Sequence, residues 1–225
     1  MTSSERIRTA LFGGSFNPIH KGHVALARQL LREGRTDEVW LMVSPRNPLK
    51  AQGGLLDEQA RLRLARLAVE GEEGISVSDF EFHLPRPSFT WTTLLALREA
   101  CPDRDFSLLI GGDNWLVFDR WAHHEEILAN HEIWVYPREG CAIDAAGLPP
   151  QVHLLEAPLF PWSSTMIRQR ISAGEDCSGM LPQRVEDEIL ACGYYAKETH
   201  TKNHTHRLRS ALSSGWTSRP RDFAQ

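Results

Sequence analysis

The chain has 225 residues, of which 41% are hydrophobic and 24% charged, proportions that are ordinary for a soluble globular protein of one domain or two small ones. Its net charge of −4 at pH 7 argues against a broad basic surface for nucleic acids. The 4 cysteines form no C-x-x-C pair, which excludes the usual zinc and disulfide patterns and fits a reducing compartment. No apolar run approaches the ~18 residues of a membrane-spanning helix, and the N-terminus lacks the apolar segment of a secretory signal. We therefore expect a cytoplasmic protein without nucleic-acid or membrane partners.

Apolar runs typical of buried strands alternate with helical patterns along the chain. The expected strands lie near residues 7–12, 39–44, 75–78, 106–110, 133–136 and 152–155. The expected helices lie near residues 22–34, 57–70, 91–100, 121–129, 164–173 and 184–192, with Asp57 as the N-cap of the second. This alternation predicts an α/β fold in which a doubly wound parallel sheet carries helices on both faces of a single domain. Ligands bind such sheets beyond the carboxyl ends of the strands.

The chain changes character close to its C-terminus. Residues 1–195 carry the periodic pattern and are expected to form the one domain. Residues 196–225 are polar and aperiodic, so we expect a largely disordered tail. The tail histidines His200, His204 and His206 fit a solvated polar segment better than a metal-binding cluster.

The segment 13–23 connects the first expected strand to the first expected helix and reads Gly-Gly-Ser-Phe-Asn-Pro-Ile-His-Lys-Gly-His. Gly13 and Gly14 let the backbone turn sharply and let a phosphate approach the amides closely. His20 and His23 lie three residues apart, so one helical face presents both imidazoles as donors to phosphate oxygens. A metal site is a competing interpretation, although no third ligand is evident nearby. A third interpretation is that His20 and His23 are surface residues at a helix start with no ligand to bind.

A second segment, at 163–168, reads Ser-Ser-Thr-Met-Ile-Arg and opens a later helix. Its three hydroxyl residues can cap the unpaired amides of the helix and can also bind phosphate. Arg168 lies in the first turn, where its fork of donors can clamp triphosphate oxygens. Taken alone, this segment fits an ordinary capped helix that carries a surface arginine better than it fits a phosphate site.

Together the two segments resemble the nicotinate and nicotinamide mononucleotide adenylyltransferases, which belong to the nucleotidyltransferase superfamily with the H-x-G-H motif. Shorter similarities to the same family occur at 44–50, 87–90 and 111–121, in the same order along the chain. The resemblance covers residues 7–195 and implies a Rossmann-like fold. Two positions depart from the family pattern, because Phe89 replaces a tyrosine and Trp162 replaces an isoleucine.

The resemblance also implies which residues form the site. The implied catalytic residues are His20, His23 and Arg168. The residues implied to bind ATP are Gly13, Gly14, Ser15, Phe16, His20, His23, Gly111, Asp113, Ser163, Ser164, Thr165 and Arg168. The residues implied to bind the mononucleotide are Asn17, Asn47, Lys50, Phe89, Thr90 and Trp121.

The implied reaction transfers the adenylyl group of ATP to nicotinate mononucleotide, giving nicotinate adenine dinucleotide and pyrophosphate in NAD biosynthesis. The nucleophile is a phosphate oxygen whose second ionisation has a pKa of ~6, so no general base is needed at neutral pH. Mg²⁺ is expected to arrive with ATP, without a metal site in the protein. The open alternatives are nicotinamide mononucleotide as the acceptor, another superfamily reaction (phosphopantetheine adenylyltransferase or cytidylyltransferase), and a non-catalytic nucleotide-binding protein. The sequence is compatible with a homo-oligomer.

Overall fold

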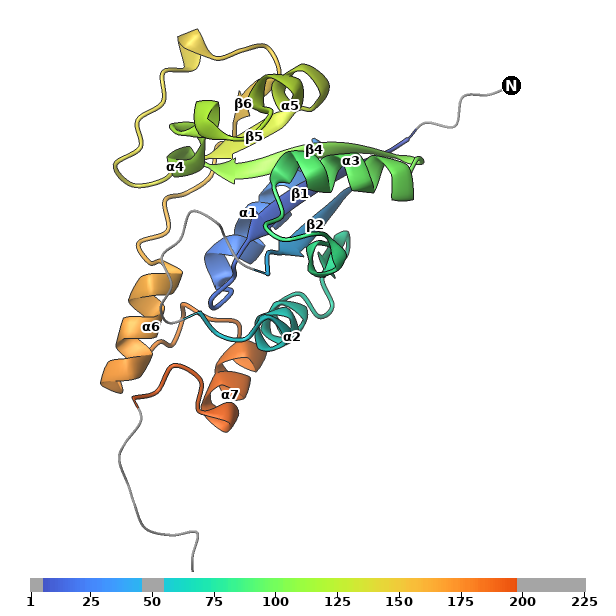
Figure 1. The fold of residues 1–225 in the computed structure, drawn as a ribbon. Helices are drawn as coiled ribbons and strands as arrows, with labels where there is room; N and C mark the ends of the chain where they lie inside the picture. The colour runs from blue at the N-terminus through green and yellow to red at the C-terminus, as the bar shows by residue number, and fades with distance from the viewer. Residues whose placement is uncertain (1–5, 46–54, 198–225) are drawn as a thin grey trace, which may run out of the picture.

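The computed structural model describes residues 6–45 and 55–197. Within them the chain forms a six-stranded sheet in the order β3-β2-β1-β4-β5-β6, with every neighbouring pair parallel. From β1 the chain adds β2 and β3 on one side, and it then crosses back to add β4, β5 and β6 on the other side of β1 (Figure 1). This is the Rossmann strand order, in which ligands bind at the switch point between β1 and β4. The predicted fold is therefore confirmed. The strands are β1 (Ile7–Gly14), β2 (Glu38–Val43), β3 (Ile75–Ser78), β4 (Arg104–Gly111), β5 (Ile133–Tyr136) and β6 (Val152–Leu154).

Helices connect these strands and extend the chain beyond the sheet. The α-helices are α1 (Lys21–Arg32), α2 (Glu58–Ala68), α3 (Thr90–Ala100), α4 (Gly112–Trp115), α5 (His124–Asn130), α6 (Ser164–Ala173) and α7 (Gln183–Cys192). The 3₁₀ helices are η1 (Phe80–His83), η2 (Phe118–Arg120) and η3 (Ala145–Gly147). None of the helices in the described ranges is long and apolar enough to cross a membrane.

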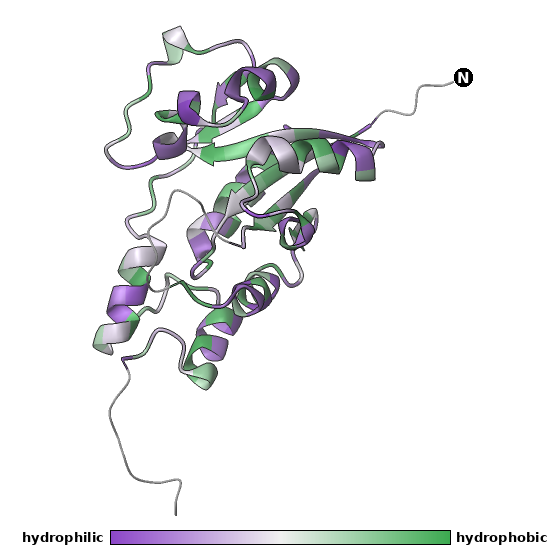
Figure 2. Ribbon diagram, viewed as in Figure 1, coloured by the Kyte–Doolittle hydropathy of each residue, from purple (hydrophilic) through white to green (hydrophobic). Residues whose placement is uncertain are grey.

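Two apolar cores cover the two faces of the sheet. Successive residues of a strand point to opposite faces, so Ala10 and Phe12 of β1 join the core beneath α1, whereas Leu11 joins the core beneath α3. The first core also includes α2, α6 and α7, and the second includes α5. Figure 2 shows central strands that are largely hydrophobic and helices in which hydrophobic and hydrophilic residues are mixed. The doubly wound arrangement follows from this two-sided burial.

Most predicted helices are confirmed, and Asp57 caps α2 by accepting hydrogen bonds from the amides of Gln59 and Ala60. The helix predicted over 121–129 is wrong at its start. Trp121 is extended and His123 has a left-handed backbone with φ 58°, so α5 begins only at His124. The His123 ring stacks on Trp91 at 5.5 Å, a tertiary contact that replaces the expected first turn. The short α4 was not predicted. The tail from residue 198 onward lies outside the described residues, so its disorder stays a prediction.

A buried arginine on α2 connects the segments that surround the end of β1. The side chain of Arg61 is 0% exposed. Its guanidinium donates to the carbonyl oxygens of Leu56 at 2.9 Å, Ser15 at 2.7 Å, Ser44 at 2.8 Å and Pro45 at 2.9 Å. All four partners are neutral, and burial lowers the pKa of the guanidinium from its ordinary high value. One side chain therefore fixes the loop after β1, the end of β2 and the approach to α2.

Arg61→Leu is expected to destabilise the protein strongly, because four buried or partly buried carbonyl groups would lose their donor. The expected loss in the free energy of unfolding is at least ~3 kcal/mol, measured by urea denaturation. Arg63→Leu is the matched control on the same helix, since Arg63 is largely exposed and pairs with Glu188 at the surface. That variant should lose less than ~1 kcal/mol. Equal losses in the two variants would contradict the role given to Arg61.

Candidate active site

A cavity of about 890 Å³ opens beyond the carboxyl ends of β1, β2 and β4. Asn47 and Lys50 lie outside the described residues. Every other site residue predicted from the sequence lines this cavity: Gly13, Gly14, Ser15, Phe16, Asn17, His20, His23, Phe89, Thr90, Gly111, Asp113, Trp121, Ser163, Ser164, Thr165 and Arg168. The fold thus brings together motifs that lie far apart in the sequence.

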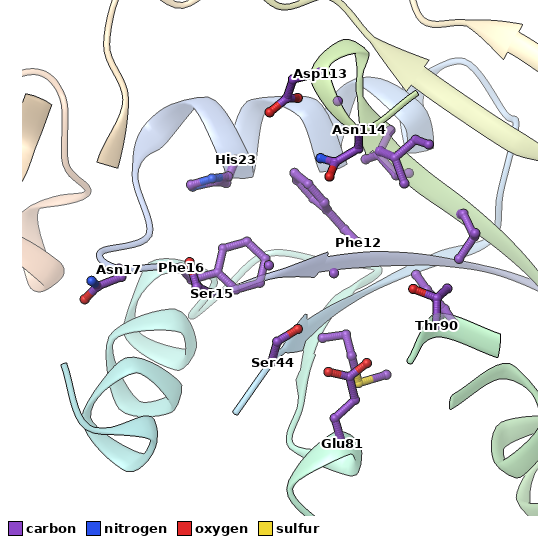
Figure 3. Close-up of a pocket in the computed structure, with 18 of the residues that line it drawn as sticks. Phe12, Ser15, Phe16, Asn17, His23, Ser44, Glu81, Thr90, Asp113 and Asn114 are labelled. Atoms are coloured by element: carbon purple, nitrogen blue, oxygen red, sulfur yellow. The ribbon is translucent and has the colours of Figure 1, made fainter. Parts of the chain in front are cut away.

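The loop after β1 takes its shape from Phe16. This residue has a left-handed backbone, with φ 43°, and its side chain is only 2% exposed. A bulky residue accepts that conformation only when its surroundings hold it there, and here the ring packs edge-on against Phe12 at 5.7 Å and His23 at 5.0 Å. A Cβ atom on Gly14 would lie 3.1 Å from the Phe16 ring, which explains the glycine. Figure 3 shows Ser15, Phe16 and His23 gathered at this end of the cavity.

The H-x-G-H segment forms the N-terminus of α1. His20 is the N-cap residue, and its amide donates to Nδ1 of His23 at 3.2 Å. Because Nδ1 of His23 accepts this bond, the proton of the neutral ring lies on Nε2. The two rings stack with centroids 3.6 Å apart. A Cβ atom on Gly22 would lie 3.0 Å from Nδ1 of His20, so the glycine between the histidines leaves room for the first ring.

His20 is neutral in the ligand-free protein. The side chain is 4% exposed, and burial, together with the nearby positive charge of Arg138, lowers its pKa to about 3. Its Nδ1 is buried and has no hydrogen-bond partner. A buried ring nitrogen without a partner is costly, and its place beside the N-terminus of α1 fits a site in which a ligand supplies the missing contact.

Helix α6 packs directly on the loop after β1. Ser163 caps the helix by accepting from the amide of Met166 at 3.2 Å, as predicted. Ser164 donates to the carbonyl oxygen of Pro18 at 2.9 Å. Arg168 donates through Nη1 to the carbonyl oxygen of Asn17 at 2.7 Å. Arginine carries five donors, so these contacts orient the Arg168 guanidinium at the cavity without using all of its donors.

Asn17 holds three parts of the chain together. Its side chain is 4% exposed, and Oδ1 accepts from the amide of Leu56 at 3.2 Å and from the hydroxyl of Tyr195 at 2.8 Å. The predicted contact between Asn17 and the mononucleotide stays a prediction. The described geometry gives this residue a clear role in fixing the loop.

The opposite sides of the cavity differ in chemistry. Beyond β4, Asp113 lies 3.5 Å from Nε of Arg138, and a Cβ atom on Gly111 would lie 2.4 Å from Oδ1 of Asp113, so this glycine is required for that carboxylate position. Near the start of α3, Phe89 is 44% exposed and Trp121 adds a second aromatic side chain to the lining. The cavity therefore presents the pair of Asp113 and Arg138 beyond β4 and aromatic surface near the start of α3.

Sequence reasoning missed four charged residues of the lining, which are Glu81, Arg86, Arg120 and Arg138. Arg138 follows β5, and Glu81 lies in η1 directly after β3. Both stand at carboxyl ends of strands, and this position in a doubly wound sheet is the signal that points to ligand-binding residues. Within the described residues, no group of three or more His, Cys, Asp or Glu side chains is arranged to hold a metal ion.

The fold and site are those of a nucleotidyltransferase, and the family model described as cytidylyltransferase-like matches residues 11–170. A probable nicotinate-nucleotide adenylyltransferase of Bacteroides fragilis is 49% identical over 185 residues, which cover 82% of this chain and 92% of the relative. One from Flavobacterium johnsoniae is 39% identical over 85% of this chain and its own full length. The chain belongs to the nicotinate-nucleotide adenylyltransferase family.

A solved structure supports the fold independently. The nicotinic acid mononucleotide adenylyltransferase of Plasmodium falciparum, complexed with NaAD, superposes with a TM-score of 0.71. The alignment covers 84% of this chain and 97% of that protein at 19% sequence identity. At this identity the similarity concerns the fold alone.

Because His20 is buried and neutral, the stability of the ligand-free protein should depend on pH. The unfolded chain takes up a proton near the ordinary histidine pKa of ~6.5, whereas the folded protein does so only near pH 3. Between these values the unfolded state binds the extra proton, so acidification lowers the free energy of unfolding by up to ~1.4 kcal/mol per pH unit from this group. His20→Asn should flatten this dependence in urea denaturation.

The matched control is His83→Asn, which changes an exposed histidine outside the cavity lining. This variant should keep the slope of the wild type between about pH 6.5 and pH 4. A slope that is unchanged in His20→Asn would contradict the neutral, buried state of His20.

Proposed function

We propose that the protein transfers the adenylyl group of ATP, taken as its magnesium complex, to nicotinate mononucleotide and releases pyrophosphate. The observation that carries this proposal is a single cavity whose lining includes the H-x-G-H helix start, α6 with Arg168, and an aromatic side near Trp121. Family membership supports the same reaction, because the relatives carry that activity in their names. The cavity has room for two nucleotides side by side.

The triphosphate of ATP is assigned to the loop after β1 and the start of α6. The N-terminus of α1 provides positive partial charge from aligned amides. His23 and Arg168 add donors from two different elements, and Arg138 adds a positive charge close to His20. A second cavity of about 360 Å³ shares His20 and Arg138 with the first. Its apolar walls, including Trp162, make it suitable for the adenine ring.

The mononucleotide is assigned to the part of the cavity near the start of α3. Trp121 offers a flat surface for the pyridine ring, and Thr90 lies in the first turn of α3. Arg120, which also lines the cavity, is adjacent to Trp121 in the chain. Its positive charge favours the carboxylate of nicotinate over the neutral amide of nicotinamide.

The chemistry needs alignment and charge stabilisation. An oxygen of the mononucleotide phosphate attacks the α-phosphorus of ATP, and the bond from that phosphorus to the pyrophosphate oxygen breaks. The attacking oxygen is already ionised above pH ~6, so no proton has to be removed. His23, Arg168 and the amides at the start of α1 stabilise the negative charge that develops on the transferred phosphate and on pyrophosphate.

The direct test is to supply purified protein with MgATP and nicotinate mononucleotide. The expected products are pyrophosphate and nicotinate adenine dinucleotide in equal amounts, with a higher kcat/KM than for nicotinamide mononucleotide. Transfer to a different acceptor, with no product from either mononucleotide, would show that the proposed substrate is wrong.

His23→Ala should reduce kcat/KM by about 10²- to 10³-fold, the effect of losing one donor to a developing charge. The free energy of unfolding should fall by ~1 to 3 kcal/mol, because the ring also accepts a bond from the His20 amide and packs against Phe16. Steady-state kinetics and urea denaturation measure the two effects separately. The control is His83→Ala, which should keep wild-type kinetics. Full turnover in His23→Ala would remove this residue from the mechanism.

We also propose that residues 1–195 form the nucleotidyltransferase domain. The hydrogen bond from Tyr195 to Asn17 supports this boundary, because it ties the end of that range to the cavity.

A further inference from the structure

Glu81 is a buried carboxylate at the cavity that the proposed reaction does not yet use. It lies in η1, immediately after the edge strand β3, and is only 9% exposed. It accepts hydrogen bonds from Oγ1 of Thr93 at 3.0 Å and from the hydroxyl of Ser44. Figure 3 shows Glu81 beside Ser44, on the opposite side of β1 from His23 and Asp113.

The surroundings of Glu81 leave part of its hydrogen-bonding capacity unused. Among the described residues, no lysine, arginine or histidine forms an ion pair with it, and burial raises the pKa of its carboxyl group. An ionised carboxylate has about four acceptor positions, and two hydroxyl groups occupy only part of them. Thr93 also lies 3.2 Å from the carbonyl oxygen of Phe89, so its single proton is shared between two acceptors. Burying such a group is costly unless a ligand completes its contacts.

Glu81 contacts both of the segments that surround the mononucleotide. Ser44 adjoins the loop assigned to the ATP triphosphate, because its amide donates to the carbonyl oxygen of Gly14 at 2.9 Å. The phosphate of the mononucleotide has to approach this loop in order to attack the α-phosphorus. Thr93 belongs to the other side, one helical turn after Thr90 in α3. The part of a mononucleotide that joins its phosphate to its pyridine ring is the ribose. The position of Glu81 between the two segments therefore corresponds to that of the ribose.

We propose that the Glu81 carboxylate accepts hydrogen bonds from the ribose hydroxyl groups of the mononucleotide and so selects a ribonucleotide as the acceptor. This inference rests on the proposed function and deepens it. Two oxygens in one plane match the spacing of two neighbouring hydroxyl groups, as in other bidentate carboxylate contacts. Ser44 and Thr93 hold the carboxylate in the orientation that this contact needs.

The test combines a change in the enzyme with a change in the substrate. Glu81→Gln keeps the size of the side chain and removes its charge. It should raise KM for nicotinate mononucleotide by about tenfold to a hundredfold, the range for a hydrogen bond to a charged group. The KM for ATP should stay within about twofold. For the wild type, KM should rise by a similar factor when the 2′-deoxy or the 3′-deoxy mononucleotide replaces nicotinate mononucleotide. For Glu81→Gln, the same replacement should raise KM little further.

The matched control is Glu70→Gln, which changes an acidic residue that pairs with Arg184 at the surface. It should discriminate between the ribose and deoxyribose substrates as the wild type does. Thr93→Val provides a second variant, because it keeps the carboxylate but removes one of the hydrogen bonds that orient it. Its discrimination between ribose and deoxyribose substrates should lie between that of the wild type and that of Glu81→Gln. Thermal denaturation establishes that each variant is folded.

Three outcomes would overturn the inference. The first is a wild type that uses ribose and deoxyribose substrates equally well. The second is full discrimination in Glu81→Gln. The third applies if Glu81→Gln does not fold, and it is a Thr93→Val variant that discriminates between ribose and deoxyribose substrates as strongly as the wild type. Failure of the proposed function is recognised separately, because the wild type would then form no dinucleotide from nicotinate mononucleotide and ATP.

Discussion

The site depends on one buried guanidinium that is bonded only to backbone carbonyl oxygens. Arg61 holds the carbonyl of Ser15 on one side and those of Ser44, Pro45 and Leu56 on the other. In a trans peptide the carbonyl and the following amide point in opposite directions. Turning the Ser15 carbonyl toward α2 therefore turns the next amide away from α2. The arginine thus determines the orientation of a backbone whose amides are assigned to phosphate, although its own side chain is fully buried.

In the H-x-G-H segment, too, neighbouring groups set the state and position of the residues assigned to the phosphates. His23 accepts a bond from the amide of His20, and this contact determines which of its ring nitrogens carries the proton. His20 is kept neutral by burial, and Gly22 provides the space for its ring. His20 therefore contributes no positive charge in the ligand-free protein. Positive charge enters from Arg138 and Arg168, which other elements supply.

Local patterns predicted much of this structure. Strand alternation predicted the sheet, and hydroxyl or acidic residues before apolar runs predicted the caps at Asp57 and Ser163. The functions of Arg61 and Glu81 could not be predicted in this way, because a charged residue on a short amphipathic segment normally faces solvent. Only the packing of distant segments buries them. The first turn predicted around Trp121 failed for the same reason, since the stacking of His123 on a residue of another helix changes the local backbone.

The contacts of Asn17 have a consequence for how the protein is made. Its partners Arg168 and Tyr195 lie 151 and 178 residues later in the chain. The nucleotide-binding motif therefore leaves the ribosome well before the groups that hold it in place. Contacts of such large sequence separation form late and slow folding. Substrate binding stabilises only the folded state, so ATP cannot assist the early stages of folding and acts as a stabiliser only after α6 and Tyr195 have packed against the loop.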